Sequence, residues 1–329
     1  MGFNREDIAL VKEEIRRRNI KAKDEATARL HALEAEIPGF REVERGFSDI
    51  GAKVIGCAVD RSMTREQREE YLAELEEKRV KLSEERARLL TAYGYPLDYT
   101  EPKYVCKLCN DTGFAGVNMC SCMRKELIKR SYQSSGIGGL VETQGFDTFS
   151  LAYYAEGEQR DYMASVLRAC REYAESFDPA TSGHILFIGG TGLGKTHLST
   201  SIARVVIEKG NNVVYESAQN IFSDFETEHF SSKYAKGELS GKYMDCDLLI
   251  IDDLGTEMAS QFNQSCLYNL INTRLNRRLP MIVSTNITDP AEIRKRYTDR
   301  LSSRFFGEFS VFNPKGTDIR SQKLANRIN

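Results

Sequence analysis

An α/β fold with a mainly parallel sheet is predicted for the C-terminal half of the sequence, preceded by a helical hairpin and a small cysteine-bearing module. Three observations lead to this prediction. Strand-like apolar runs alternate with helix-like runs after residue 150, as in βα units around a parallel sheet. Apolar residues recur at steps of three and four over much of residues 1–95, which is helical spacing. Four of the eight cysteines gather between positions 106 and 122.

Length and charge limit the organisation of the chain. The 329 residues are enough for about two domains of ordinary size. We divide them into a helical N-terminal domain (1–95), a cysteine module (96–130), a linker rich in Ser and Gly (131–150) and the α/β domain (151–329). Because the net charge is only −2, any contact with nucleic acid must come from a local patch.

The sequence gives no sign of a membrane segment or a secretory signal. No apolar run approaches the ~18 residues of a spanning helix. The first residues are charged from Arg5 onward, unlike a signal peptide. We therefore expect a cytoplasmic protein without membrane contact, in which the four cysteines outside the cluster are small buried hydrophobes.

The N-terminal region predicts two long helices. The first apolar stripe stops at Pro38 and Gly39, a pair that breaks helices. Thr64 and Gln67 fit a capping box that opens the second helix, and Gly94 ends it. Either the two helices form an antiparallel hairpin held by its own apolar seam, or part of the seam docks on the helices of a partner. The sequence leaves both interpretations open.

A phosphate-binding loop follows the first predicted strand of the α/β domain, residues 185–188. The residues GGTGLGKT match the Walker A pattern, in which glycines let backbone amides face a phosphate with no Cβ in the way. The next helix points its positive dipole end at the same anion. Lys195 is expected to reach the β- and γ-phosphates, and the Thr196 hydroxyl to ligate Mg²⁺. The expected nucleotide-binding residues are Gly189, Gly190, Thr191, Gly192, Leu193, Gly194, Lys195, Thr196 and His197.

Two further apolar runs end in polar residues that complete such a site. The run 248–251 leads into Asp252 and Asp253, and a strand buried on both faces carries acids only at its end. We expect Asp252 to hold Mg²⁺, directly or through water, and Asp253 to orient or deprotonate the attacking water. The run 280–285 leads into Asn286, whose amide is placed to hold that water against the γ-phosphate.

Arginines near the C-terminus are candidates for sensing phosphate. Arg300 and Arg304 lie four residues apart on one helical face, and Arg320 follows in the sequence GTDIR. A planar guanidinium suits the charge of a γ-phosphate better than lysine does. The alternative is a solvated basic face.

The clustered cysteines predict a structural metal site. Cys106 and Cys109 form a CxxC pair, Cys120 and Cys122 form a CxC pair, and ten residues separate the two pairs. Four thiolates are sufficient for tetrahedral Zn²⁺, and they leave no open position for catalysis. An iron–sulfur cluster and four unrelated free thiols are the alternatives. Four basic residues follow, either as phosphate contacts or as a solvated helix face: Arg124, Lys125, Lys129 and Arg130.

The segment between the second and third predicted strands, residues 217–245, combines aromatic residues with lysines. Such a mixture suits stacking on unpaired bases together with neutralisation of phosphates. Phe222 and Phe225 lie at helical spacing, which favours a place in the core. The better candidates for a surface that binds single-stranded DNA are Lys233, Tyr234 and Lys236.

The order of the motifs GGTGLGKTHLS, LLIIDDLG, STN, DRLSSRF and GTDIR resembles the DnaC/DnaI-type helicase loaders, which are AAA+ ATPases, and their IstB-type transposition relatives. The resemblance covers roughly residues 140–329. It implies ATP and Mg²⁺ as cofactors, with Lys195 and Thr196 as the Walker A pair and Asp252 and Asp253 as the Walker B pair. It also implies Asn286 as sensor 1, Arg304 as an arginine finger that reaches a neighbouring subunit's ATP, and Arg320 as sensor 2.

The same resemblance implies a function. Such a protein forms ATP-controlled oligomers, binds single-stranded DNA and loads a hexameric replicative helicase, which its N-terminal domain holds. Two departures from general AAA+ proteins are visible: Asp253 stands where most have Glu, and residues 313–329 are too few for a separate lid domain. The rival hypotheses are an IstB-like transposition helper that binds duplex DNA and a transposase, and a nucleotide-switched adaptor with little hydrolysis, suggested by Asp253.

Overall fold

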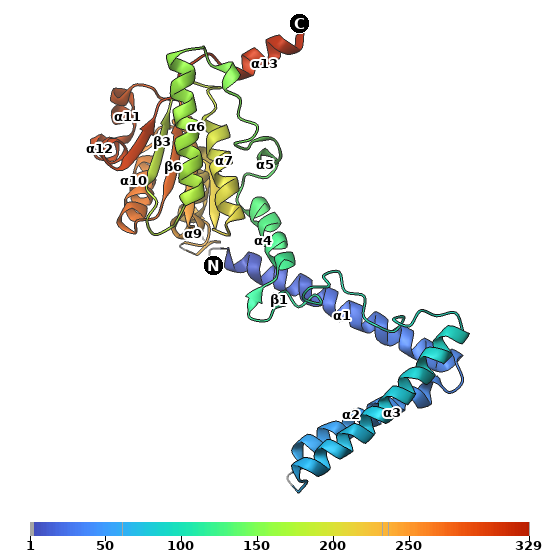
Figure 1. Cartoon of the computed structure of the whole chain (residues 1–329). Helices are drawn as coiled ribbons and strands as arrows, with labels where there is room; N and C mark the ends of the chain where they lie inside the picture. Colours follow the sequence, from blue (N-terminus) through green and yellow to red (C-terminus); the bar gives the residue numbers. More distant parts are fainter. Residues whose placement is uncertain (1–2, 61, 232, 236, 329) are drawn as a thin grey trace. The chain divides into compact units, whose positions relative to one another are not determined.

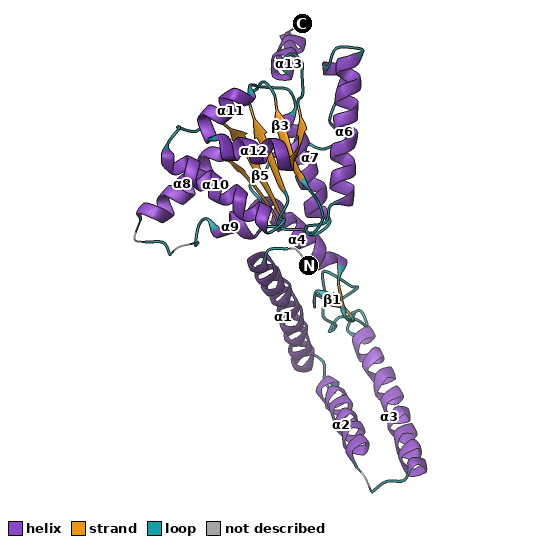
Figure 2. Ribbon diagram, turned by 90° about the vertical axis from the view of Figure 1, so that its left-hand side faces the viewer, coloured by secondary structure: helices purple, strands orange, loops and turns teal. Residues whose placement is uncertain are grey.

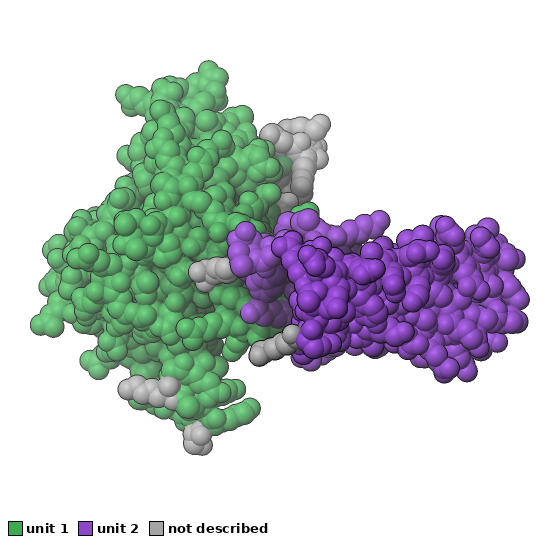
Figure 3. Space-filling view, turned by 60° about the horizontal axis from the view of Figure 1, so that its bottom comes forward, with its two compact units in different colours: residues 1–11, 123–329 green, residues 12–122 purple. Residues whose placement is uncertain are grey.

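The computed structural model describes residues 3–60, 62–231, 233–235 and 237–328 (Figure 1). Two compact units make up the chain, one formed by residues 12–122 and the other by residues 1–11 together with 123–329 (Figure 3). None of the described helices combines the length and the apolar character that crossing a bilayer requires.

A five-stranded parallel sheet forms the centre of the larger unit, which confirms the predicted α/β fold. Its strands run in the order β4-β5-β6-β3-β7, and every neighbouring pair is parallel. The strand bounds are β3 (His184–Ile188), β4 (Val213–Ser217), β5 (Leu248–Leu254), β6 (Met281–Thr285) and β7 (Phe309–Phe312). The central strands read as nearly continuous apolar runs because both of their faces are covered.

Helices cover both faces of the sheet (Figure 2). Side chains alternate along each strand, so Ile185 and Phe187 enter the core on one face while Leu186 and Ile188 enter the core on the other. The first face is covered by α6 (Glu158–Ser176) and α7 (Lys195–Glu208). The second is covered by α8 (Ala218–Phe230), α10 (Gln261–Asn276), α11 (Pro290–Tyr297) and α12 (Asp299–Glu308).

Short elements complete the larger unit. They are α5 (Leu140–Thr143), the 3₁₀ helix η1 (Leu151–Tyr153), α9 (Gly241–Asp245) and α13 (Ile319–Ile328), which is the helix described after β7. The segment 131–150, expected as a linker, packs against the core. Its Ile137 is buried, and the Ser135 carbonyl accepts a 2.7 Å hydrogen bond from the Tyr215 amide on the outer edge of β4. The domain boundaries at 95, 130 and 150 stay predictions.

Among its described residues, the smaller unit contains three long helices where the sequence predicted two. They are α1 (Arg5–Glu36), whose first residues belong to the larger unit, α2 (Phe40–Val59) and α3 (Arg65–Ala92). Helices α2 and α3 form the hairpin (Figures 1 and 2), in which Leu82 packs on Gly46 and Arg86 donates to Glu44 at 2.7 Å. The second long helix was predicted correctly, whereas residues 40–59 form a helix that the apolar stripe did not separate.

Local sequence signals set the ends of these helices as predicted. Gly39, with φ of 84°, supplies the left-handed turn between α1 and α2. The capping box is present: the Gln67 amide donates to the Thr64 hydroxyl at 3.2 Å, and the Thr64 amide donates to the Gln67 side chain at 3.0 Å. Gly94, with φ of 80°, ends α3.

After α3 the chain forms a short antiparallel hairpin, β1 (Phe114–Ala115) and β2 (Asn118–Met119), and then enters α4 (Ser121–Ser134). Asn110 and Asp111, which precede this hairpin, have positive φ angles of 49° and 51°. Both residue types tolerate this conformation because their short polar side chains bond to nearby backbone. The tight turn that results brings the two cysteine pairs into one small module.

Arg274 is a fully buried cation that joins three parts of the larger unit. Its guanidinium donates to the carbonyls of Tyr243 at 2.9 Å, Cys246 at 3.1 Å and Pro280 at 2.8 Å. Burial lowers the pKa of this arginine. The three carbonyls lie at the end of α9, just before β5 and just before β6, so one side chain fixes the amino ends of two neighbouring strands.

We expect Arg274→Ala to lower the free energy of unfolding of the larger unit by about 3–5 kcal/mol, because buried carbonyls lose their donor and a cavity forms. Urea denaturation of the full chain measures the change. Arg277→Ala is the matched control, since Arg277 is half exposed and pairs with Asp245 at 2.9 Å, and its loss should cost at most about 1 kcal/mol. Equal effects of the two substitutions would contradict the structural role of Arg274.

Candidate nucleotide site

The loop between β3 and α7 has the conformation that phosphate binding requires. Gly192 and Gly194 have φ angles of 71° and 87°, which residues with a Cβ rarely adopt. A Cβ added at Gly194 would lie 2.9 Å from the Tyr154 hydroxyl, and one added at Gly189 would lie 2.8 Å from the Pro314 carbonyl oxygen. The glycines therefore serve both the backbone conformation and the close approach of surrounding chain.

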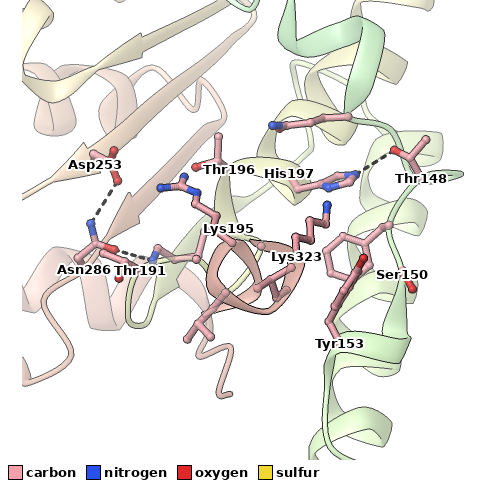
Figure 4. Close-up of a pocket in the computed structure, with 17 residues that line it drawn as sticks. Thr148, Ser150, Tyr153, Thr191, Lys195, Thr196, His197, Asp253, Asn286 and Lys323 are labelled. Carbon is pink, nitrogen blue, oxygen red and sulfur yellow. Dashed lines mark hydrogen bonds between the residues drawn. The ribbon is translucent and has the colours of Figure 1, made fainter. Parts of the chain in front are cut away.

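A pocket of about 210 Å³ lies beside this loop (Figure 4). The structure brings most of the predicted site residues together there: Thr191 to His197, Asp253, Asn286 and Arg320. The remaining lining was not assigned to the site from the sequence, and it comes from residues 144–153 and from Ile319 and Lys323 on either side of Arg320.

Lys195 is held by three acceptors, two in the loop and one after β6. Its ammonium lies 2.6 Å from the Gly189 carbonyl oxygen, 2.7 Å from that of Gly190 and 2.7 Å from Asn286 Oδ1. Burial lowers the pKa of Lys195, and the carboxylates of Asp253 and Asp252 act in the opposite direction. A buried cation with these neighbours is placed to exchange carbonyl partners for phosphate oxygens.

Asn286 connects Lys195 to the second acid of β5. Its Nδ2 lies 3.3 Å from Asp253 Oδ1, while its Oδ1 accepts from Lys195, as Figure 4 shows. Asp253 has φ of 53°, a left-handed conformation that turns its side chain out of the strand, and it is exposed. The carboxylate is therefore accessible to water beside the pocket, as the predicted role requires.

Asp252 is nearly buried and accepts hydrogen bonds from three hydroxyl groups. Thr196 donates to its Oδ2 at 3.2 Å and Tyr215 donates to the same oxygen at 2.6 Å. Ser284, on β6, donates to Oδ1. The Walker A pattern predicts the place of Thr196, but no local pattern predicts Tyr215 or Ser284, because nothing in the local sequence shows that strands β4 and β6 flank β5.

These groups fit a nucleoside triphosphate with a divalent cation. The glycine loop and the start of α7 offer backbone N–H groups to phosphate, and Lys195 offers a positive charge. Thr196 and Asp252 supply the hard oxygen ligands that Mg²⁺ prefers. The chemistry of the donor set therefore agrees with the cofactors expected from the sequence.

The segment 144–153 forms part of the pocket wall, and its Phe149 packs against Gly194 of the loop. The Phe149 ring packs edge-on against His197 at a centroid distance of 5.2 Å. His197 Nε2 lies 2.9 Å from the Gly145 carbonyl oxygen, so this nitrogen carries a proton. Burial lowers the pKa of His197, which favours the neutral ring. Residues 131–150 were predicted as a linker, and the aromatic residues among them were the sequence signal that this segment joins the site.

The predicted arginines separate into two places. Arg320 lines the nucleotide pocket, as expected for a sensor of the chain's own nucleotide. Arg304 instead lines a hollow of about 510 Å³ together with His184, at the amino end of β3. There its guanidinium lies 3.2 Å from the Asn272 side chain. Because the phosphate loop follows the carboxyl end of β3, Arg304 lies at the opposite end of the strand from its own pocket.

The four clustered thiols lie in one place. All the sulfur atoms are within 4.8 Å of one another, with 3.8 Å between Cys106 and Cys120 and 3.5 Å between Cys109 and Cys122. A tetrahedron with Zn–S bonds of ~2.3 Å has S···S edges of ~3.8 Å, so the spacing fits a single metal ion. The buried Asp111 carboxylate supports the loop by accepting the amides of Val105 and Cys106.

Two of the four basic residues after this cluster are used inside the larger unit. Arg124 donates to the Glu208 carbonyl at 3.1 Å, and Arg130 pairs with Asp7 at 3.3 Å. Lys125 and Lys129 are exposed. The structure thus favours an intramolecular role for the arginines over contact with phosphates.

The segment 217–245 separates into core and surface residues. Phe222 is buried and Phe225 packs against the same core, which confirms their core interpretation. Lys236 lies outside the described residues. At the end of α8 the Phe230 side chain is 75% exposed, and its ring lies 5.6 Å from that of Phe262 and 4.7 Å from that of His229. This exposed aromatic group, which the sequence did not single out, combines residues from two helices.

Comparisons with known proteins agree with the motif pattern. Residues 169–293 match the family model described as IstB-like ATP binding protein. The chain is 32% identical over 190 residues to the chromosomal replication initiator protein DnaA of Aliarcobacter butzleri (strain RM4018), a match that covers 55% of this chain and 39% of that protein. It is 25% identical over 177 residues to the replicative helicase loader DnaC of Escherichia coli (strain K12), covering 54% of this chain and 69% of DnaC.

Solved structures with a similar core include a DnaC helicase loader, at 19% identity and a TM-score of 0.47, covering 54% of this chain and 99% of that chain. A structure of DnaI matches at 17% identity and a TM-score of 0.43, covering 54% and 92%. The chain thus combines Walker-type motifs with a parallel sheet, its residues 169–293 match the IstB-like ATP-binding family model, and it is similar in sequence to the replicative helicase loader DnaC.

Proposed function

We propose that this chain is an ATP-dependent loader that places a hexameric replicative helicase on single-stranded DNA. The observation that carries the proposal is a pair of hydrogen bonds, one from Lys195 to Asn286 and one from Asn286 to Asp253. Together they join a phosphate-binding cation to an accessible carboxylate. The similarity to DnaC supports the choice of a loader among the many functions of P-loop proteins.

In the proposed mechanism the loop amides and Lys195 hold the triphosphate. Thr196 and Asp252 would hold Mg²⁺, which would supply positive charge to the phosphates. Asp253 orients the attacking water, and the Asn286 amide holds it in line. Because Asp is one methylene shorter than Glu, the Asp253 carboxylate reaches less far toward the attacking water, and we infer that hydrolysis is weak. We also infer that DNA stimulates it.

Arg304 is proposed to act on the ATP of a neighbouring subunit. Its place at the amino end of β3 keeps it from its own pocket, so contact with a γ-phosphate requires a second copy of the chain. ATP binding would then favour an oligomer, because the guanidinium gains a charge-assisted hydrogen bond only when a triphosphate is present. Hydrolysis would remove that bond and release the neighbour.

Contacts with DNA and helicase are assigned to different surfaces. The exposed ring of Phe230 beside Phe262 offers a face on which an unpaired base stacks, and Lys233 lies three residues further on. The helicase is proposed to dock on the α2–α3 hairpin, where Ile55 and Val59 are 68% and 74% exposed. Structural Zn²⁺ held by the four cysteines is proposed to stabilise the cysteine module around residues 106–122.

A second candidate is an IstB-like transposition helper, which the family match over residues 169–293 favours. It differs from a loader in binding duplex DNA and a transposase. Affinity for duplex over single-stranded DNA, measured at one salt concentration, separates the two functions, because both bind phosphates but only a loader requires unpaired bases.

We expect Lys195→Ala to weaken ATP binding by ~10–100-fold, the value of one buried charge-assisted hydrogen bond. We expect Arg304→Ala to bind ATP normally and to lose hydrolysis by roughly 10³-fold, as for other arginine fingers. Equilibrium binding of a fluorescent ATP analogue and release of phosphate measure the two effects.

Mixing the two variants tests action in trans. Arg304→Ala supplies an intact pocket and Lys195→Ala supplies an intact finger, so the mixture should recover part of the hydrolysis that each lacks alone. Arg300→Ala serves as the matched control for Arg304, since both lie on α12 and Arg300 is exposed. Normal hydrolysis by Arg304→Ala would contradict the proposal for this residue, and normal ATP binding by Lys195→Ala would contradict the site itself.

Metal analysis of the purified chain should find one zinc per molecule. Cys109→Ser should lose the metal and destabilise the smaller unit, because the binding energy of a structural zinc is folding energy. Cys57→Ala, in the same unit but outside the cluster, should keep the metal. Iron with visible absorption would indicate an iron–sulfur cluster, and a metal-free folded protein would indicate four free thiols.

The loader function predicts a complex of the full chain with a hexameric replicative helicase. Replacing Ile55 and Val59 together by Asp should abolish the complex, because two exposed apolar contacts become charges, while ATP binding persists. Val117→Asp, at a site that is 95% exposed elsewhere in the same unit, should leave the complex intact. Size-exclusion chromatography with the helicase decides the outcome, and the absence of any complex with the parent chain would refute the loader function.

A further inference from the structure

Tyr215 makes a hydrogen bond that neither the Walker motifs nor the sensor positions include. It lies on β4, is 6% exposed, and its hydroxyl donates to Asp252 Oδ2 at 2.6 Å. This is shorter than the 3.2 Å between the same oxygen and the Thr196 hydroxyl.

The position of Asp252 in the sheet explains what such a bond does. Strand β5 lies between β4 and β6, and the carboxylate at its end receives Tyr215 from one side and Ser284 from the other. A carboxylate has about four lone-pair positions. Three of them are taken by the two flanking hydroxyls and Thr196, which leaves one for a divalent cation or its water.

The Tyr215 backbone is fixed from outside the sheet. Its amide donates to the Ser135 carbonyl at 2.7 Å, and Gly136 packs so closely on the Tyr215 carbonyl that an added Cβ would collide with it. Because these contacts hold the backbone and the ring is buried, the position of the phenol oxygen is restricted. The rotation of the Asp252 carboxyl group is therefore restricted before any cation arrives.

We propose that Tyr215 is a positioning residue for the divalent cation, because it restricts the rotation of the Asp252 carboxylate beside the Thr196 hydroxyl. The proposal rests on the proposed ATP site and extends it to a residue outside the recognised motifs. Groups that orient a metal ligand typically change metal affinity by ~10–100-fold when removed. Removing the phenol hydroxyl should therefore change the affinity for the divalent cation rather than the affinity for the nucleotide.

The test compares the full chain with Tyr215→Phe, which keeps the ring and removes the hydroxyl. Binding of a fluorescent ATP analogue is measured in EDTA and then over a Mg²⁺ titration, so that the readout is affinity and not turnover. In EDTA we expect the affinities of the two proteins for the ATP analogue to agree within about twofold. The Mg²⁺ concentration that gives half of the affinity gain should rise by ~10-fold in Tyr215→Phe.

Tyr243→Phe is the matched control. Tyr243 is fully buried in the same unit and also donates to a carboxylate at 2.6 Å, that of Asp224, which lies outside the nucleotide pocket. Both variants should lose similar thermal stability, and Tyr243→Phe should keep the Mg²⁺ requirement of the parent. If Tyr215→Phe also keeps that requirement, the phenol only packs and the proposal is overturned.

A second variant tests whether Tyr215 acts through Asp252. In an Asp252→Asn background the substitution Tyr215→Phe should not raise the Mg²⁺ requirement further, because the ligand that it positions is gone. Additive losses would overturn the proposal. A parent chain that binds no nucleotide would refute the proposed function together with this inference, whereas Mg²⁺-strengthened binding that Tyr215→Phe leaves unchanged would refute the inference alone.

Discussion

The parallel pairing of β4, β5, β6 and β3 is the constraint on which the site depends. Parallel strands end at the same edge of a sheet, so residues that follow different strands become neighbours there. Ile188 pairs with Thr285, and Ser217 pairs with Asp252. The residues just after these pairs are the phosphate loop, Asp253 and Asn286. Any slip in register would separate Lys195 from Asn286, since the two touch through a single 2.7 Å hydrogen bond.

The same edge carries charges that a protein interior ordinarily excludes. Lys195 is 5% exposed and Asp252 is 8% exposed. A buried charge costs little only when hydrogen bonds replace water, and here carbonyls surround the ammonium while hydroxyls surround the carboxylate. The groups are thus held in place by the hydrogen bonds that make their burial tolerable. At the opposite end of the strands the buried Arg274 also donates to carbonyls, and there its role is structural.

The two units are stabilised by different means. The larger unit has an apolar core on each face of its sheet. The region around residues 106–122 in the smaller unit has little core of its own, with Val105 and Leu108 exposed, and its cysteines lie at the spacing of a metal tetrahedron. The proposed metal ion would replace the buried apolar area that so short a segment lacks. The proposed functions follow this division, with ATP in the larger unit and the helicase on the smaller one.

The sequence by itself determined the α/β class, the phosphate loop, the acids at the end of β5 and the cap of α3, because each depends on residue types at short, fixed spacing. It also placed the four thiols in one cluster. The separate helix 40–59 was missed, since its apolar positions continue a helical pattern without a strong start signal.

The tertiary structure alone decided which distant residues share the site. Tyr215 and Ser284 reach Asp252 from neighbouring strands, and residues 144–153 line the pocket although they precede the phosphate loop by some forty positions. Strand order and side-chain burial arise from the packing of the whole unit. A sequence motif with fixed spacing describes only residues that are near one another along the chain, so it contains no information about these contacts.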